Sequence, residues 1–148
     1  MNVLSIGNSF SCDAQRYLHG IAAADGYALN CFNLYIGGCP LATHFRNLHT
    51  DQPAYTLEMN GVNTGFRVSI KEALLNREWD VVTLQQASHD SCNYETYQPY
   101  LSVLADAVRT YADFAKKCAD PAVHDVFMDI VREERSHLVE LRGKLAAI

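Results

Sequence analysis

The feature that most constrains this chain is the run Trp-Asp-Val-Val-Thr-Leu-Gln at residues 79–85, which is the strongest strand signal in the sequence. Apolar residues are nearly continuous along it. That pattern is typical of a parallel strand buried on both faces of a sheet, because helices then cover both sides. We therefore expect residues 79–85 to form a central strand of a parallel sheet.

Strand and helix patterns alternate before and after this run. We expect strands over 2–6, 27–35 and 79–85, helices over 13–24, 41–48 and 69–77, a small hairpin inserted over 55–69, and a further helix from about Thr96. Asp13 is the expected N-cap of the first helix, and Ser69 with Glu72 has the spacing of a capping box. This order predicts an α/β protein with helices on both faces of a parallel sheet.

Composition excludes several classes of function. The chain has 148 residues and a formal net charge of −5, with no cluster of Lys or Arg, which argues against nucleic-acid binding. No apolar stretch approaches the roughly 18–20 residues of a membrane span, and no signal peptide is recognisable. The five cysteines are odd in number and scattered singly, so we expect small buried free thiols in a cytoplasmic protein.

A candidate nucleophile follows the first strand. The segment Gly7-Asn8-Ser9-Phe10-Ser11 places a serine between a parallel strand and a helix, at the carboxyl edge of the sheet, where α/β proteins bind ligands. The start of the helix would offer N–H groups and a favourable dipole to an oxyanion. The alternative is a turn in which the serine only caps the helix.

Three segments resemble the first three conserved blocks of SGNH-type serine hydrolases, in the same order. They are SIGNSFS at 5–11, NLYIGGCPLATHFRN at 33–47 and WDVVTLQQASHDS at 79–91. The chain is most similar to a group of uncharacterised bacterial SGNH proteins over residues 1–111. The resemblance implies a three-layer α/β/α sandwich of SGNH (flavodoxin-like) type and hydrolysis of a carboxylic ester, such as deacetylation of a carbohydrate, with no cofactor.

The resemblance also implies roles for individual residues. Ser9 is the nucleophile, and its own N–H together with that of Gly38, or of Gly37, lines the oxyanion hole. Most SGNH enzymes add an asparagine amide from the third block. Here a glutamine would supply it, Gln86 or else Gln85.

The sequence departs from the family at two points. Asn8 stands where the family usually has Asp, and no Asp-x-x-His block supplies the general base. We expect His89, beside Asp90 in the third block, to act as base, or another chain to supply one. We expect the other histidines of predicted helices, His19, His44 and His49, to be surface or capping residues.

A parallel sheet truncated to three strands would leave residues 79–85 at an edge. An unpaired apolar edge promotes association, so either C-terminal helices cover it, or the chain forms a homodimer, or the fold is marginally stable.

The chain changes character near residue 112, which divides an α/β domain (1–112) from a helical segment (113–148). The segment resembles the last helix of ferritin-like, rubrerythrin-type proteins. Glu134 lies within its apolar stripe and His137 at the edge, and Glu-x-x-His is the spacing of di-iron sites. A complete site needs further ligands, so a solvated or arginine-paired glutamate is the alternative, and no metal site is assigned.

Three functions therefore remain open. The chain is a serine hydrolase that acts on a small-molecule or carbohydrate ester, an inactive SGNH-like remnant that serves as a binding module, or a metal-binding helical assembly through Glu134 and His137.

Overall fold

The computed structural model describes residues 1–117. Its strands are β1 (Asn2–Gly7), β2 (Asn30–Tyr35), β3 (Tyr55–Met59), β4 (Val62–Val68) and β5 (Val81–Leu84). Its helices are α1 (Ser9–Ala24), α2 (Leu41–His49), α3 (Ile70–Leu75), the 3₁₀ turn η1 (Tyr94–Tyr97) and α4 (Tyr100–Lys117). The predicted alternation of strands and helices is thus confirmed.

The strands form one mixed sheet in the order β4-β3-β2-β1-β5. β1 lies at its centre and pairs in parallel with β2 on one side and β5 on the other. The hairpin of β3 and β4 is not a separate insertion, because β3 pairs antiparallel with β2 and extends the same sheet.

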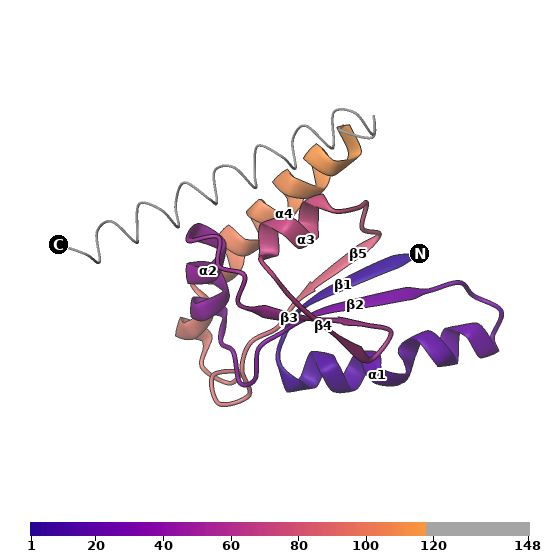
Figure 1. Cartoon of the computed structure of the whole chain (residues 1–148). Coiled ribbons are helices and arrows are strands. Elements are labelled where there is room, and N and C mark those ends of the chain that lie inside the picture. The colour runs from indigo at the N-terminus through magenta and orange to yellow at the C-terminus, as the bar shows by residue number, and fades with distance from the viewer. Residues whose placement is uncertain (118–148) are drawn as a thin grey trace.

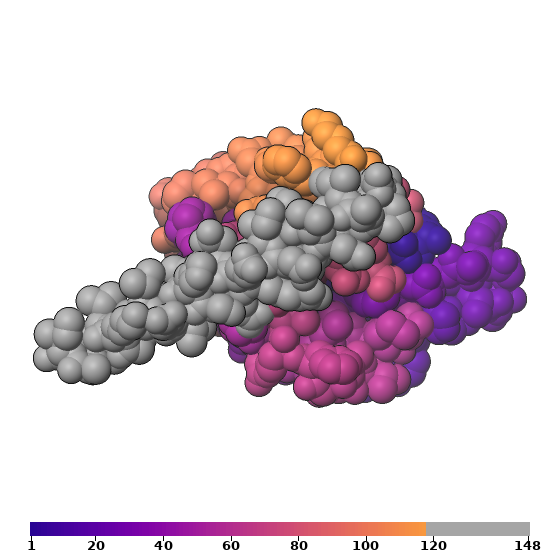
Figure 2. Space-filling view, turned by 45° about the horizontal axis from the view of Figure 1, so that its top comes forward, coloured from indigo at the N-terminus to yellow at the C-terminus, as the bar shows by residue number. Residues whose placement is uncertain are grey.

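Helices cover both faces of the sheet, in three layers (Figure 1). α1 lies against one face, over β1 and β2, and α2, α3 and α4 lie on the other. The second half of α1 and the turn after it extend away from the rest of the described molecule, as the purple lobe of Figure 2 shows. This projection explains why only Ser11 and Gln15 of α1 are buried.

The two faces of the sheet differ in chemistry. Toward α2, α3 and α4 the strands present fully buried aliphatic side chains such as Leu4, Ile6 and Leu34, which form the core with Leu74 and Trp79. The core is therefore one-sided, as expected where alternate strand residues point to opposite faces.

Toward α1 the strands present buried polar residues next to the apolar Val3 and Cys31. Asn33 Nδ2 donates a hydrogen bond to Glu58 Oε2 at 2.8 Å, and Ser11 Oγ of α1 lies 2.8 Å from Asn33 Oδ1. Deeper along the same helix, Gln15 Nε2 donates to Ser5 Oγ. Hydrogen bonds thus join the first half of α1 to the sheet.

β5 differs from its prediction. It is parallel to β1, but it lies at an edge of the sheet and its residues are alternately exposed and half-buried within residues 1–117. The apolar run predicted a strand buried on both faces. Among the described residues, no strand pairs with the outer edge of β5. The expectation of an edge strand is confirmed for the described part of the chain.

Helix boundaries follow local capping chemistry. α1 begins four residues before its predicted start, because Asn8 rather than Asp13 is its N-cap. The capping box of Ser69 and Glu72 is confirmed at α3. The helix predicted from about Thr96 is instead a 3₁₀ turn followed by α4, which begins after Pro99 and continues unbroken past residue 112.

Candidate functional site

One buried side chain gathers the loops at the carboxyl edge of the parallel strands. Asn8, only 1% exposed, follows β1, and its Nδ2 donates to the carbonyl oxygens of Cys39 and Gln86, each at 3.3 Å. Cys39 follows β2 and Gln86 follows β5. The segments that carry the three family-like blocks therefore meet at this edge of the sheet, held by a single amide.

Ser9 is the first residue of α1 and its side chain is exposed. The next two N–H groups of the helix are taken, because Phe10 N donates to Asn8 Oδ1 and Ser11 N donates to Gln85 Oε1. Within residues 1–117 no hydrogen bond engages the N–H of Ser9. Both the hydroxyl and the amide of Ser9 are therefore open to a ligand.

The approach of β1 to α1 depends on Gly7. A Cβ atom at this position would lie 2.6 Å from Ser11 Oγ and 2.7 Å from Gln85 Oε1, which is closer than any side chain tolerates. Only glycine fits between strand, helix and glutamine. This packing fixes the position of Ser9 relative to the end of β1.

Gly37 and Gly38 form the turn after β2. Gly38 has a φ of +61°, a left-handed conformation that favours glycine, and Cys39 N closes the turn on Ile36 O at 3.3 Å. Both glycines are exposed, and among the described residues neither N–H donates a hydrogen bond. The turn thus offers backbone donors at the edge that carries Ser9.

The adjacent glutamines have different partners. Gln86 is buried and caps the start of α2, because its Oε1 accepts from Leu41 N at 2.9 Å. Its Nε2 donates to Thr96 O and Thr96 Oγ1 at 3.1 and 3.0 Å, so both of its hydrogens are used. Gln85 is half-buried, its Oε1 accepts from Asn8 N and Ser11 N, and its Nε2 has no partner within residues 1–117.

His89 lies in the loop after β5 and is exposed. Its Nε2 lies 3.5 Å from Asp90 Oδ2, which is the distance of an ion pair. No hydrogen bond joins His89 to Ser9 in the described structure. The structure therefore places the predicted base on the same loop as Gln86, beside a carboxylate that can orient it.

A buried cluster lies beneath the glycine turn. His44 was expected at the surface or at a cap, but it is fully buried, and its Nδ1 lies 2.9 Å from Tyr55 Oη and 3.6 Å from Cys39 Sγ. Burial lowers the pKa of His44 to about 4 and raises the pKa of Cys39 to about 11. Both groups are therefore neutral near pH 7 and anchor the turn without acting as acid or base.

The cysteines only partly match the expected small buried thiols. All four in the described structure are free, and Cys31 and Cys39 are buried. Cys12 is half-buried and Cys92 is exposed, because Cys92 lies in the loop after β5. Cys118 lies outside the described residues.

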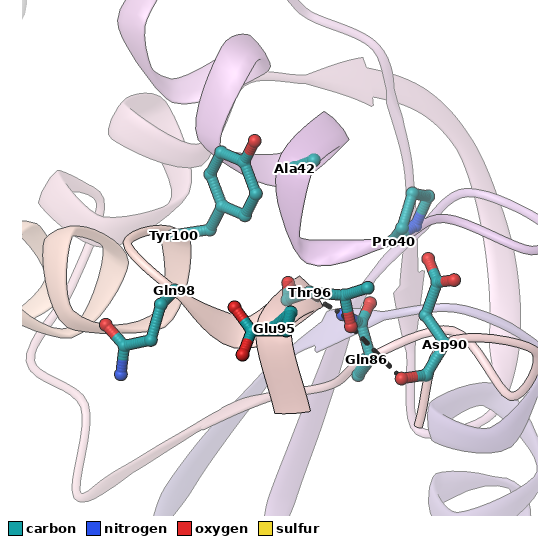
Figure 3. Close-up of a pocket in the computed structure, with 8 residues that line it drawn as sticks. All are labelled: Pro40, Ala42, Gln86, Asp90, Glu95, Thr96, Gln98 and Tyr100. Carbon is teal, nitrogen blue, oxygen red and sulfur yellow. Dashed lines mark hydrogen bonds between the residues drawn. The ribbon is translucent and has the colours of Figure 1, made fainter. Parts of the chain in front are cut away.

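A pocket of about 340 Å³ opens along the same edge (Figure 3). It lies between the start of α2 and the segment from Gln86 to Tyr100. Its lining comprises Pro40, Ala42, Gln86, Asp90, Glu95, Thr96, Gln98 and Tyr100. Ser9 does not line this pocket. Its neighbour Asn8 is hydrogen-bonded to the loops after β2 and β5, and these two loops form part of the pocket wall.

The candidate metal pair Glu134 and His137 lies outside the described residues. Within residues 1–117 no group of three or more His, Cys, Asp and Glu side chains is arranged to hold a metal ion. No helix in that part of the chain is long and apolar enough to cross a membrane.

Sequence reasoning missed the tie made by Asn8 and the capping role of Gln86. Both depend on hydrogen bonds across 31 to 78 residues of chain, which local patterns do not reveal. The one signal in the sequence was an asparagine, a favoured N-cap residue, directly between an apolar run and a helical pattern.

Comparisons with known proteins give a family but no activity. The family model described as "Domain of unknown function (DUF4886)" matches residues 2–128. A crystal structure of a DUF4886 family protein from Bacteroides uniformis superposes with a TM-score of 0.70 at 36% sequence identity. The match covers 75% of this chain and 45% of that one, so the matched part spans less than half of the solved protein. None of the curated proteins compared with the chain matches it.

Proposed function

The chain belongs to the DUF4886 family, and from that premise we propose that it is a serine hydrolase of SGNH type with Ser9 as its nucleophile. The observation that carries the proposal is the state of Ser9. It is exposed at the first position of a helix, directly after a central parallel strand, and its own N–H is unengaged within the described residues. A serine that only capped the helix would be expected at position 8, which Asn8 occupies.

The proposed reaction is hydrolysis of a carboxylic ester in two steps. Ser9 Oγ attacks the carbonyl carbon while His89 removes its proton, and the carbonyl oxygen becomes an oxyanion. Collapse breaks the ester bond, and the alcohol leaves with the proton from His89. Water then attacks the acyl-enzyme with the same base, which releases the carboxylic acid and restores Ser9.

The oxyanion would be bound by backbone N–H groups of Ser9 and Gly38. A side-chain amide is a third donor, and the sequence favoured Gln86 for it. As placed, Gln86 would have to leave Thr96 to reach an oxyanion. The proposal therefore gives the role to Gln85, whose oxygen is fixed at the start of α1 while its Nε2 is free among the described residues.

The proposed base is His89. His89 has Asp90 beside it as an orienting carboxylate, but its ring is exposed and does not touch Ser9 in the unliganded molecule. Catalytic hydrogen bonds often tighten only when substrate binds, and we expect the hydrogen bond between His89 and Ser9 to form at that stage. The alternative base is one supplied by another chain.

Active-site labelling tests the proposal directly. The full chain is incubated with a fluorophosphonate probe, and the modified residue is identified by intact mass and peptide mapping. We expect labelling of the wild type on Ser9, none in Ser9→Ala, and unchanged labelling in Ser88→Ala, a matched exposed serine of the same edge. Folding of each variant is verified by circular dichroism. A folded wild type that does not react contradicts the hydrolase.

Three further variants separate the roles of the two glutamines and test the base. Gln85→Ala should slow labelling of the folded protein by about 10²–10³-fold, the cost of one oxyanion donor. It should also lower the melting temperature, because Asn8 N and Ser11 N lose their acceptor at the start of α1. Gln86→Ala should lower the melting temperature without this slowing of labelling, since it uncaps α2. His89→Ala should slow labelling by about 10²–10⁴-fold, with His49→Ala as the control.

A binding module without chemistry is the second candidate. The observation that favours it is the pocket, whose lining does not include Ser9. Ligand binding to a chain that the probe does not label would support this function over hydrolysis.

A further inference from the structure

The pocket at the carboxyl edge of the sheet, near Ser9, is lined by negative charges without positive ones. Two of its eight lining residues, Asp90 and Glu95, carry carboxylates, and none is Lys, Arg or His. In Figure 3 these two side chains lie on either side of Thr96. Within residues 1–117, the basic group placed against these carboxylates is the His89 ring, whose Nε2 lies 3.5 Å from Asp90 Oδ2. A ligand in this pocket therefore meets a negative potential.

The polar groups of the pocket divide into used and unused ones. Gln86 and Thr96 are saturated, because Gln86 Nε2 donates to Thr96 and Thr96 Oγ1 lies within hydrogen-bond distance of Asp90 O and Asn93 O. They form a fixed wall. The carboxylate of Glu95, the amide of Gln98 and the hydroxyl of Tyr100 have no hydrogen-bond partner within residues 1–117. These groups can bind ammonium and hydroxyl groups of a ligand.

The apolar lining suits a small ring. Tyr100 is held edge-on by Phe45 at 5.3 Å between ring centroids, which fixes one wall, and Pro40 provides another. An aromatic face attracts a nearby cation as well as an apolar ring face. The volume of about 340 Å³ falls at the low end of the roughly 300–1,000 Å³ of small-molecule sites, so one compact ring fits better than an extended ligand.

We propose that this pocket binds a single hydroxyl-bearing ring that carries an amine, such as an amino sugar, and discriminates against anionic sugars. This inference deepens the proposed function, because it takes the pocket as the subsite for the alcohol part of the ester. Binding itself requires neither Ser9 nor turnover, so the two proposals can fail separately.

The test is a binding titration with three sugars of similar size and different charge. The full chain with Ser9→Ala is titrated with glucosamine, glucose and glucuronate at pH 7 and low ionic strength, and binding is followed by NMR. We expect glucosamine to bind about fivefold more tightly than glucose, and glucuronate more weakly than glucose. The preference should shrink at high salt, because exposed charges are screened.

Variants locate the source of the preference. Glu95→Gln should reduce it while leaving the His89–Asp90 pair intact, and Asp90→Asn with Glu95→Gln should abolish it. Glu78→Gln, an exposed glutamate before β5, is the matched control and should preserve it. Equal affinity for the three sugars, a preference that survives the double substitution, or no binding of glucosamine at the highest concentration tested would overturn the inference.

The labelling experiment keeps the two proposals apart. Probe labelling of Ser9 without amine selectivity leaves the hydrolase standing and removes the amine subsite. Amine selectivity in a protein that the probe does not label leaves a binding pocket and removes the hydrolase.

Discussion

The two faces of the sheet use opposite means to hold their helices. Toward α2, α3 and α4, the side chains of Leu4, Ile6 and Leu34 are fully buried and form an apolar core. Toward α1, Ser5, Asn33 and Glu58 are buried and hydrogen-bonded. Apolar burial is strong but not directional, whereas a buried polar network is satisfied in one geometry only.

The two faces therefore contribute differently to the free energy of folding and to the position of α1. The apolar face provides most of the free energy of folding. The polar face sets the position of α1, because a shift of the helix would separate Ser11 from Asn33. α1 begins with Ser9, so we expect the polar face to matter more for reactivity than its contribution to stability suggests.

The largest expected effect comes from the apolar face. Leu34→Ala should lower the free energy of unfolding by about 4 kcal/mol, because a fully buried side chain is lost and a cavity remains. Urea unfolding measures the change. Phe66→Ala, at an exposed position of β4, is the control and should change stability by about 0.5 kcal/mol or less. A Leu34→Ala loss no larger than that of the control would contradict the one-sided core.

His44 is a polar group on the apolar side of the sheet, and it should make stability depend on pH. Burial lowers its pKa from 6.5 to about 4, so the unfolded chain binds a proton that the folded protein does not. Stability is therefore present above pH 6.5 and is lost by about 3 kcal/mol as pH falls from 6.5 to about 4.

The measurement is the free energy of unfolding at several pH values for the wild type and His44→Gln. Carboxylates titrate in the same range, so the difference between the two proteins isolates His44. Parallel curves for the two proteins would show that His44 does not contribute this dependence.

A smaller loss of stability is expected from the polar face, with a larger effect on Ser9. Asn33→Ala removes the donor to Glu58 and a partner of Ser11, which should cost about 2 kcal/mol. We expect the rate of Ser9 labelling to fall further than in Leu34→Ala, measured under conditions where both variants are folded. The same labelling rate in both variants would show that the polar face does not position Ser9.

Thiol reactivity gives the smallest effect and reports which region opens first. Cys92 is exposed and should react first with iodoacetamide. Cys12, on the polar face, should follow slowly, because burial and then the Glu58 carboxylate raise its pKa. Cys39 should react only on unfolding, since burial raises its pKa to about 11. Peptide mapping over time gives the order, and early modification of Cys39 would mean that the glycine turn opens locally.

Local patterns predicted much of this molecule. The apolar strands, the glycine and serine at the end of β1 and the capping box at Ser69 each depend on residues close in sequence. The position of β5 at the edge of the sheet was harder to predict, because an apolar run looks the same whether a strand is central or at an edge. The buried position of His44 depends on Tyr55, eleven residues away and on a different element.

The candidate site was predicted less completely than the fold. The position of Ser9 follows from the end of an apolar run, and the assignment of Gly38 follows from the resemblance of residues 33–47 to the second SGNH block. The different roles of Gln85 and Gln86 do not, because neighbouring residues of one type differ only in which distant groups they reach. Gln86 reaches Leu41 and Thr96, whereas Gln85 reaches the start of α1.

The side-chain amide of Asn8 joins the loops after β1, β2 and β5 through its hydrogen bonds. A carboxylate in its place could accept but not donate, so both carbonyl partners, Cys39 O and Gln86 O, would lose their donor at once. Substitutions or insertions in any one of these loops should therefore be energetically coupled to changes in the other two, and double-mutant cycles should show strong non-additivity. In evolutionary terms, the three loops have to vary as one unit.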